Sequence, residues 1–250
     1  IEEHITFSRG SFDAGSGSDA LVRMDGTTRQ RITGSFEGSN AFNRFELNNS
    51  DGMEVLDSVE IDETFTLNSG MVYLPDTALV TLHSTSSGAL TGAGSSRYIQ
   101  GPLRKQISNG DAYTFETGDT SRYGKLTLSG TSPETPQYWE VQYYNNNPDV
   151  YGYDTSSYAS SLEEISGNEF WRVKGPGGQS HVTIRWDNLS ALPAQTDDRE
   201  ANLRLTEYLS GQWEETGSNV TDNGPSDGTI QTDSPVDLEE HVFTLGTRES

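Results

Sequence analysis

The chain has 250 residues, with 16 Lys and Arg against 38 Asp and Glu and a formal net charge of -22 at pH 7. A field of that sign repels nucleic-acid phosphates and anionic lipid headgroups, so binding to nucleic acid or to a membrane surface is excluded. The sequence contains no cysteine, which excludes disulfide frameworks and thiolate metal sites, and no apolar run is long enough for direct membrane insertion.

Helical periodicity is almost absent, while short β-branched and aromatic runs alternate with clusters of Gly, Asn, Asp and Ser. This pattern predicts an all-β protein, and its length suits two β units better than one small sandwich. The best candidate for a helix is the segment 156–167, where Tyr158, Leu162 and Ile165 could share one face before a glycine.

The first half of the chain, residues 1–107, combines brief, evenly spaced predicted strands with few aromatic residues. It also contains an internal echo, because the segments 5–10 and 20–24 parallel the segments 65–70 and 78–82. A unit this small cannot bury an apolar face alone, so the repetition predicts a β-solenoid-like stack of coils or a meander with one shared core. The competing explanation is chance similarity among β-rich segments.

The second half, residues 108–250, has longer predicted strands and all four tryptophans. In the segments 181–186 and 203–205, apolar residues alternate with polar ones, which predicts one buried and one solvated face. The turn Ser210-Gly211-Gln212 predicts a hairpin before Trp213. About seven or more such strands favour an immunoglobulin-like or jelly-roll β-sandwich.

Three sets of segments stand out, namely 45–52 with 59–61 and 65–70, then 98–105 with 113–119 and 123–128, then 166–173 with 182–187 and 243–246. Together they resemble a module found in very large secreted surface proteins of gliding, Bacteroidetes-type bacteria. In the second set, Glu116-Thr117 replaces the Pro-Val of the family pattern. The resemblance implies type IX secretion, an extracellular location at the cell surface of a Gram-negative bacterium, and a role in adhesion or gliding motility. It implies no catalytic residue.

Tyrosines around the segment 138–144 are the strongest indication of a ligand site, because aromatic faces stack on sugar rings. The candidate residues are Tyr138, Tyr144, Tyr151 and Tyr153. The competing explanation is that alternate members of this strand face the core, while the outer tyrosines cover loops with their hydroxyls solvated.

Calcium is the one cofactor that the sequence suggests, because several turns are rich in oxygen ligands. The candidate ligands are Asp149, Asp154, Asp197, Asp198, Asp222 and Asp227. None of these turns matches an EF-hand, and Asn and Asp also favour turns for backbone reasons, so turn formation without any cofactor is the competing explanation. The four histidines stand far apart, without the spacing of metal ligands.

Adjacent acidic residues such as Glu163/Glu164 and Glu214/Glu215 are poor acid–base pairs, because neighbouring side chains in a strand point to opposite faces. We therefore expect no enzyme, but a structural or adhesive segment of a large secreted bacterial cell-surface protein or filament. The first predicted coil opens in mid-repeat, so its exposed edge is expected to pair with neighbouring repeats or subunits of the same protein. The alternative is a carbohydrate-binding module of a secreted polysaccharide-processing protein, with a surface glycan as its partner.

Overall fold

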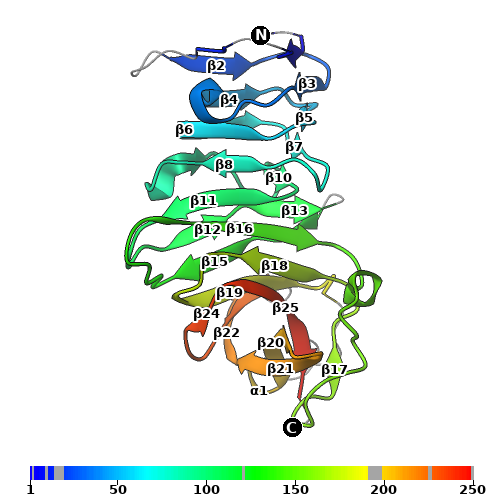
Figure 1. Cartoon of the computed structure of the whole chain (residues 1–250). Helices are drawn as coiled ribbons and strands as arrows, with labels where there is room; N and C mark the ends of the chain where they lie inside the picture. The colour runs from blue at the N-terminus through cyan, green and yellow to red at the C-terminus, as the bar shows by residue number, and fades with distance from the viewer. Residues whose placement is uncertain are drawn as a thin grey trace. The chain divides into compact units, whose positions relative to one another are not determined.

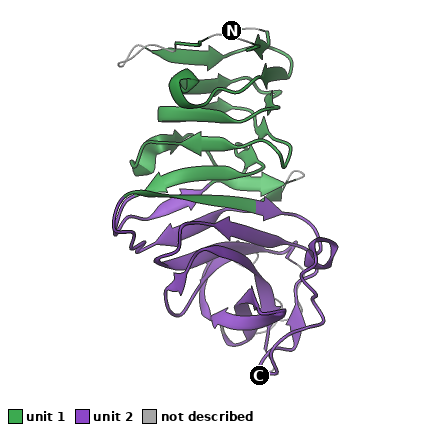
Figure 2. Ribbon diagram, in the orientation of Figure 1, with its two compact units in different colours: residues 1–107, 116–123, 136–142 green, residues 108–115, 124–135, 143–250 purple. Residues whose placement is uncertain are grey.

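The computed structural model describes residues 1, 3–8, 11–13, 20–119, 122–190, 199–224 and 227–248. It is all-β, with 53% strand and 5% helix, as the sequence predicts. Contacts divide the chain into two compact units (Figure 2). Unit 1 holds residues 1–107, 116–123 and 136–142, and unit 2 holds 108–115, 124–135 and 143–250.

Unit 1 is a β-solenoid-like stack of about 4 turns, which confirms that part of the prediction. Successive strands alternate between two sheets, and within each sheet they stack on one another in parallel (Figure 1). The first sheet contains β1 (Ile5–Thr6), β3 (Gln30–Thr33), β5 (Met53–Val55), β7 (Val72–Tyr73), β10 (Ile99–Gln100) and β13 (Thr117–Asp119), followed by the antiparallel β14 (Arg122–Tyr123).

The second sheet of unit 1 contains β2 (Leu21–Met24), β4 (Phe42–Asn48), β6 (Val59–Ser69), β8 (Val80–Leu82) and β11 (Leu103–Ile107). The short β9 (Leu90–Thr91) also pairs with β6, and residues 137–141 of β16 (Gln137–Tyr144) pair antiparallel with β11.

Parallel register brings equivalent residues of successive coils into buried columns. One column, from β3 to β13, runs through Gln30, Met53, Val72, Ile99 and Thr117, and each of them is 1% exposed or less. Four of these residues are apolar or small, but the first is a buried amide. The stack therefore ends, on the side of β1, in a polar group that needs hydrogen-bond partners.

Aromatic residues fill the interior between the two sheets. Phe36 stacks on Phe42 at a centroid distance of 4.7 Å, and Phe45 lies 4.8 Å from Phe42 and 5.4 Å from Phe65. All four rings are 2% exposed or less. The aromatic residues of this half are few, as the sequence shows, but they are concentrated in one ladder that joins consecutive coils.

The internal echo is only half reproduced in space. Its Ala-Leu-Val parts lie in β2 and β8, which belong to the same sheet of unit 1. Its other parts separate, because Ile5–Thr6 forms β1 of the first sheet, whereas Phe65–Leu67 continues the 11-residue strand β6 in the second. Coil lengths differ along the chain, so equal spacing in sequence does not mean the same place in the coil.

Unit 2 consists of antiparallel strands. In one group of paired strands the order is β12 (Tyr113–Phe115), β15 (Leu126–Ser129), β19 (Gln179–Asp187), β23 (Asp227–Gln231) and β22 (Asn219–Gly224), and β24 (Val236–Asp237) also pairs with β19. In the other group the strand order is β18 (Phe170–Lys174), β25 (Glu240–Thr247), β20 (Leu203–Leu209) and β21 (Gln212–Gly217), and β17 (Glu164–Ile165) also pairs with β25.

The alternation predicted for 181–186 is confirmed, since Val182, Ile184 and Trp186 are buried and the residues between them are half-buried. The same prediction is wrong at Arg204, which is only 6% exposed. Its guanidinium lies 2.9 Å from Glu215 and donates to two main-chain carbonyls, so the burial of its charge is compensated. The hairpin turn is confirmed, because Ser210 and Gly211 both have positive φ between paired β20 and β21.

The predicted helix over 156–167 does not form. Turns and the short strand β17 occupy this segment. At its start, the Asp154 carboxylate accepts hydrogen bonds from Ser156 N (2.9 Å) and Ser156 Oγ (2.7 Å) and closes a local turn. The helices that the described residues do contain are α1 (Arg199–Asn202) and the 3₁₀ turns η1 (Gly38–Asn40), η2 (Ser87–Ala89) and η3 (Pro148–Tyr151). None of them is long and apolar enough to cross a membrane.

Candidate functional site

The first coil of unit 1 leaves two strand edges open. β1 and β2 are the terminal strands of their sheets, and in the part of the chain that the structure describes each pairs with one strand, β3 or β4. Unpaired edges present main-chain donors and acceptors that can template another strand. This end of the solenoid is therefore the candidate interaction site of unit 1.

The hydrogen bonds of β2 reveal which of its groups face the open edge. Arg44 N donates to Ala20 O (3.2 Å) in the parallel pairing with β4, so the main-chain groups of Leu21 and Arg23 point away from β4. The amino group of Ile1 donates to Arg23 O (2.9 Å), and Asp25 N donates to Ile1 O (3.0 Å). Ile1 thus makes one rung of a parallel ladder on the open edge of β2.

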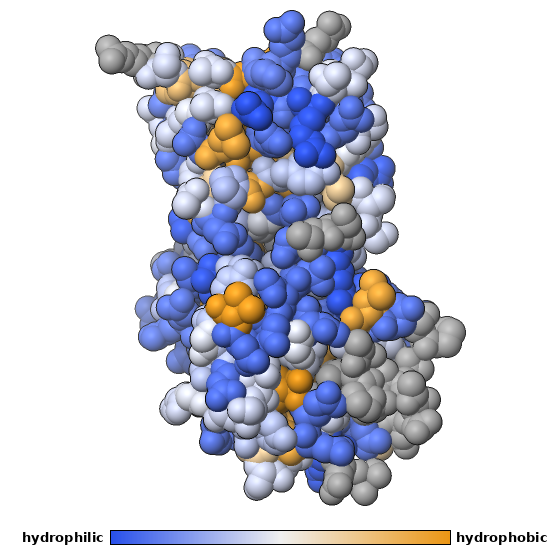
Figure 3. All heavy atoms as spheres, turned by 90° about the vertical axis from the view of Figure 1, so that its right-hand side faces the viewer, coloured by the Kyte–Doolittle hydropathy of each residue, from blue (hydrophilic) through white to orange (hydrophobic). Residues whose placement is uncertain are grey.

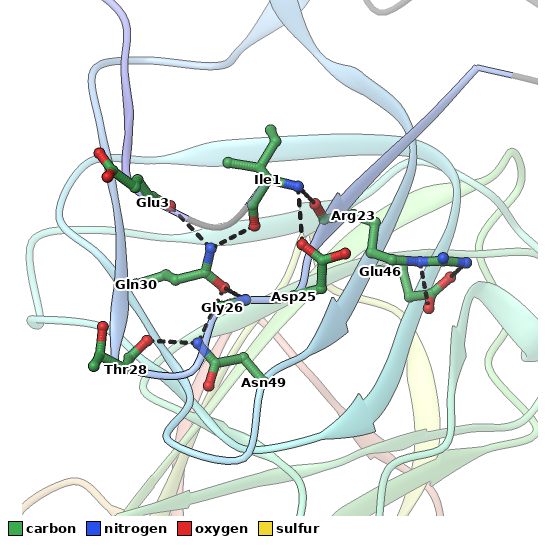
Figure 4. Close-up of polar contacts among 9 residues, drawn as sticks. All are labelled: Ile1, Glu3, Arg23, Asp25, Gly26, Thr28, Gln30, Glu46 and Asn49. Atoms are coloured by element: carbon green, nitrogen blue, oxygen red, sulfur yellow. Dashed lines mark hydrogen bonds and ion pairs between the residues drawn. The ribbon is translucent and has the colours of Figure 1, made fainter.

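A buried amide holds the chain in this position (Figure 4). Gln30 Nε2 donates to Ile1 O (2.7 Å) and to Glu3 O (2.9 Å). Its Oε1 accepts from Gly26 N (3.0 Å) and from Asn49 Nδ2 (3.0 Å). Both donor hydrogens and both acceptor positions of this amide are used, which satisfies a polar group that would otherwise be costly to bury.

Asn49 extends the network into the next coil. It is 1% exposed, and its Nδ2 also donates to Thr28 O (2.7 Å), while its Oδ1 accepts from Asp51 N (3.0 Å). The sequence singled out Asn49 only as a member of the segment 45–52, and it did not single out Gln30. No local pattern could have identified Gln30, because its role depends on the stacking of its strand next to the segment that carries Glu3.

Charged pairs flank the open edge on the outer face. Arg23 Nε lies 2.8 Å from Glu46, and Glu46 also accepts from Asn68 Nδ2 (2.6 Å), so one carboxylate joins β2, β4 and β6. The Arg23 side chain is 50% exposed, so this pair adds little stability, but charges beside an open edge disfavour unselective pairing. In the view of Figure 3, hydrophobic residues form only small, separate groups on a hydrophilic surface.

The predicted tyrosines do not form one site. Tyr144, Tyr151 and Tyr153 gather in unit 2, where all three contact the ring of Phe170 at centroid distances of 4.4, 5.1 and 5.7 Å. Tyr144 is only 3% exposed, whereas Tyr151 is 42% exposed. Of these three residues, Tyr151 is the most exposed.

Tyr138 lies in unit 1 and belongs to a different cluster. Its hydroxyl is 2.5 Å from His83 Nδ1, and His83 Nε2 is 3.0 Å from Glu60. Burial, followed by Glu60 and Asp62, raises the pKa of Tyr138, and Arg104 opposes that shift. The phenol is therefore a neutral group whose hydrogen bond to His83 ties β16 to the strands before it, and it is not a partner of the other tyrosines.

Two of the predicted calcium ligands, Asp149 and Asp154, bond within their own loop. Asp149 accepts from Thr155 N (2.6 Å) and Thr155 Oγ1 (3.0 Å), and Asp154 accepts from Ser156, whose hydrogen bonds lower its pKa. Asp227 pairs with Arg185 (2.5 Å) across β19 and β23, whereas Asp222 is exposed on β22. Asp197 and Asp198 lie outside the described residues. Among the residues that are described, no group of three or more His, Asp or Glu side chains could hold a metal ion.

Tyr98 is a buried phenol of unit 1 that the sequence indicated only as the first residue of the segment 98–105. It is 1% exposed, and its ring packs so closely on Gly118 that a Cβ there would lie 2.4 Å from it. Burial, followed by Tyr73 and Asp119, raises the pKa of Tyr98 to about 12.

This shift predicts a loss of stability in alkali. In the unfolded chain Tyr98 ionises near its ordinary pKa of 10.0, but in the folded chain it stays neutral to about 12, so its contribution is complete below pH 10 and is lost as the pH rises through 12. We expect the free energy of unfolding to fall by about 2 kcal/mol more in the wild type than in Tyr98→Phe between pH 9 and pH 12. Urea unfolding across this range measures the difference, and equal pH profiles would contradict it.

A comparison of the chain with family models, curated proteins and solved structures finds no match.

Proposed function

We propose that the chain is a non-catalytic structural and adhesive segment of a large secreted bacterial cell-surface protein or filament. On this proposal it is exported by a type IX route and lies outside the cell at the surface of a Gram-negative bacterium, where it serves adhesion or gliding. The support for export and location is the motif resemblance in the sequence. The support for a structural role is the solenoid, because stacked coils make a stiff element whose length grows with each coil.

We also infer that unit 2 is an immunoglobulin-like or jelly-roll sandwich. This is favoured by its antiparallel strands and by the complete burial of Trp171, Trp186 and Trp213, which are each 1% exposed or less. Sandwiches of this kind commonly act as spacers and ligand-presenting modules in surface proteins, so the assignment is consistent with the proposed role.

The observation that carries the proposal is the rung between Ile1 and β2. In this rung the open edge makes main-chain hydrogen bonds in parallel register, with Arg23 O as the acceptor and Asp25 N as the donor. A neighbouring repeat or subunit of the same protein would continue this ladder through the remaining groups of Leu21 and Arg23.

A proline at Leu21 tests this pairing. The Leu21 N–H faces the open edge, so Leu21→Pro removes a donor for an incoming strand without removing a rung to β4. We expect the wild type to associate with increasing concentration in sedimentation velocity, and Leu21→Pro to associate at least about tenfold more weakly, with its circular dichroism spectrum unchanged.

Val22→Pro is the matched control, because Val22 N–H points toward β4 and its loss should destabilise β2 itself. A wild-type chain that stays monomeric at millimolar concentration, or a Leu21→Pro chain that associates as strongly as the wild type, would refute assembly through this edge.

Carbohydrate binding is the second candidate function, as part of a secreted polysaccharide-processing protein. The observation in its favour is the exposed ring of Tyr151 in unit 2.

A further inference from the structure

One loop of unit 2 displays apolar side chains to solvent. Val150 and Tyr151 are neighbours in η3, and they are 69% and 42% exposed. Val150 is the most exposed large hydrophobic residue among those that the structure describes. A ligand that covered these two side chains would remove apolar surface from water and gain hydrophobic stabilisation.

The loop around them is held by its own hydrogen bonds. Asn147 Oδ1 accepts from Asp149 N (2.8 Å) at the start of η3, and Gly152, at a φ of +87°, ends it with its N–H directed to Asp149 O (3.1 Å). The Asp149 carboxylate then accepts twice from Thr155. A loop fixed in this way has already lost its conformational entropy, so a ligand would not have to order it.

The ring of Tyr151 packs against two other aromatic rings, those of Tyr144 and Phe170. Its centroid lies 4.8 Å from that of Tyr144 at 58°, and 5.1 Å from that of Phe170 at 62°. Tyr144 is parallel to Phe170 at 4.4 Å, and the Arg172 guanidinium lies 5.4 Å from the centre of the Tyr144 ring. Tyr144 and Phe170 therefore support the exposed ring and take no part in contacting a ligand themselves.

We propose that Tyr151, with Val150 beside it, is a stacking platform for a pyranose ring of a neutral polysaccharide. This inference rests on the adhesive part of the proposed function and gives it a site and a ligand class. The C–H groups on one face of a sugar ring carry partial positive charge and pack against the electron-rich face of an aromatic ring. A net charge of -22 disfavours acidic polysaccharides, which leaves neutral chains as the ligand.

Affinity electrophoresis of the whole chain in gels containing dextran, laminarin, xyloglucan or mannan tests the proposal, with alginate as the acidic comparison. We expect retardation by at least one neutral polysaccharide and none by alginate. Tyr151→Ala should weaken that binding about threefold to tenfold, as the loss of one aromatic contact does, whereas Tyr151→Phe should keep it within about twofold.

Tyr138→Ala is the control variant, because Tyr138 lies in unit 1 and hydrogen-bonds His83. It should bind the polysaccharide as the wild type does. No retardation by any of the four neutral polysaccharides, or equal binding by Tyr151→Ala and the wild type, would overturn the proposal. Sedimentation of Leu21→Pro tests the solenoid edge independently, so failure of the glycan site and failure of the proposed assembly can be told apart.

Discussion

Gly70→Ala is expected to destabilise unit 1 by about 4 kcal/mol, through backbone strain and a steric clash together. Gly70 follows β6 with a φ of +82°, and an added Cβ would lie 1.9 Å from Asn49 O and 2.9 Å from the Gly52 main chain. These atoms belong to the turn of the preceding coil, which cannot move away without breaking the stack. Urea unfolding followed by far-ultraviolet circular dichroism measures the loss.

Gly38→Ala separates the two contributions. Gly38 also belongs to unit 1 and has a φ of +58°, but a Cβ there would meet no atom within 4 Å. We expect this variant to lose only the strain of the left-handed conformation, about 1–2 kcal/mol. If both variants lose the same stability, close coil-on-coil contact at Gly70 is not the reason for its glycine.

Phe45→Ala is expected to cost about 3–5 kcal/mol, since it removes the central ring of the aromatic ladder. Phe45 is 2% exposed and pairs in register with Phe65 of the next coil, with Phe42 on its other side. The cavity would lie between two β-sheets. Hydrogen bonds hold the strands within each sheet in place, so these strands have little freedom to collapse into the cavity.

The variant Phe45→Leu keeps most of the volume and should lose about 1–1.5 kcal/mol. Hydrogen exchange of the β4 and β6 amides would locate the loss, which should appear in unit 1. A cost below about 1 kcal/mol for Phe45→Ala would contradict a tightly packed interior at this position.

The candidate site at the open edge could be anticipated only in outline. The brief, evenly spaced apolar segments before residue 107 predict stacked coils or a meander, and stacked coils would have an open edge. The burial of Gln30 could not be predicted, because a glutamine in a short strand is expected at the surface. Only its register with Met53 and Val72 places it in a buried column. Coils of unequal length conceal that register in the sequence.

The ligand site was predicted in part. The sequence grouped Tyr138 with Tyr144 and Tyr151 because they are close along the chain, and alternation along β16 cannot tell which neighbours each ring meets. The fold separates them, since residues 137–141 of β16 pair with β11 in unit 1, whereas Tyr144 stacks on Phe170 of unit 2. Exposure of Tyr151 depends on η3, which only the hydrogen bonds of its loop establish.

By itself, the sequence determined that this is an acidic, all-β protein with a repetitive first half, because period-two alternation, turn residues and charge are local properties. The tertiary structure decided which residues of different coils stack, why Gly70 and Gln30 stand where they do, and which of the four tyrosines is the most exposed. Those outcomes depend on contacts between segments far apart in the chain, such as Gln30 with Glu3 and Tyr151 with Phe170. Local sequence patterns do not reveal such contacts.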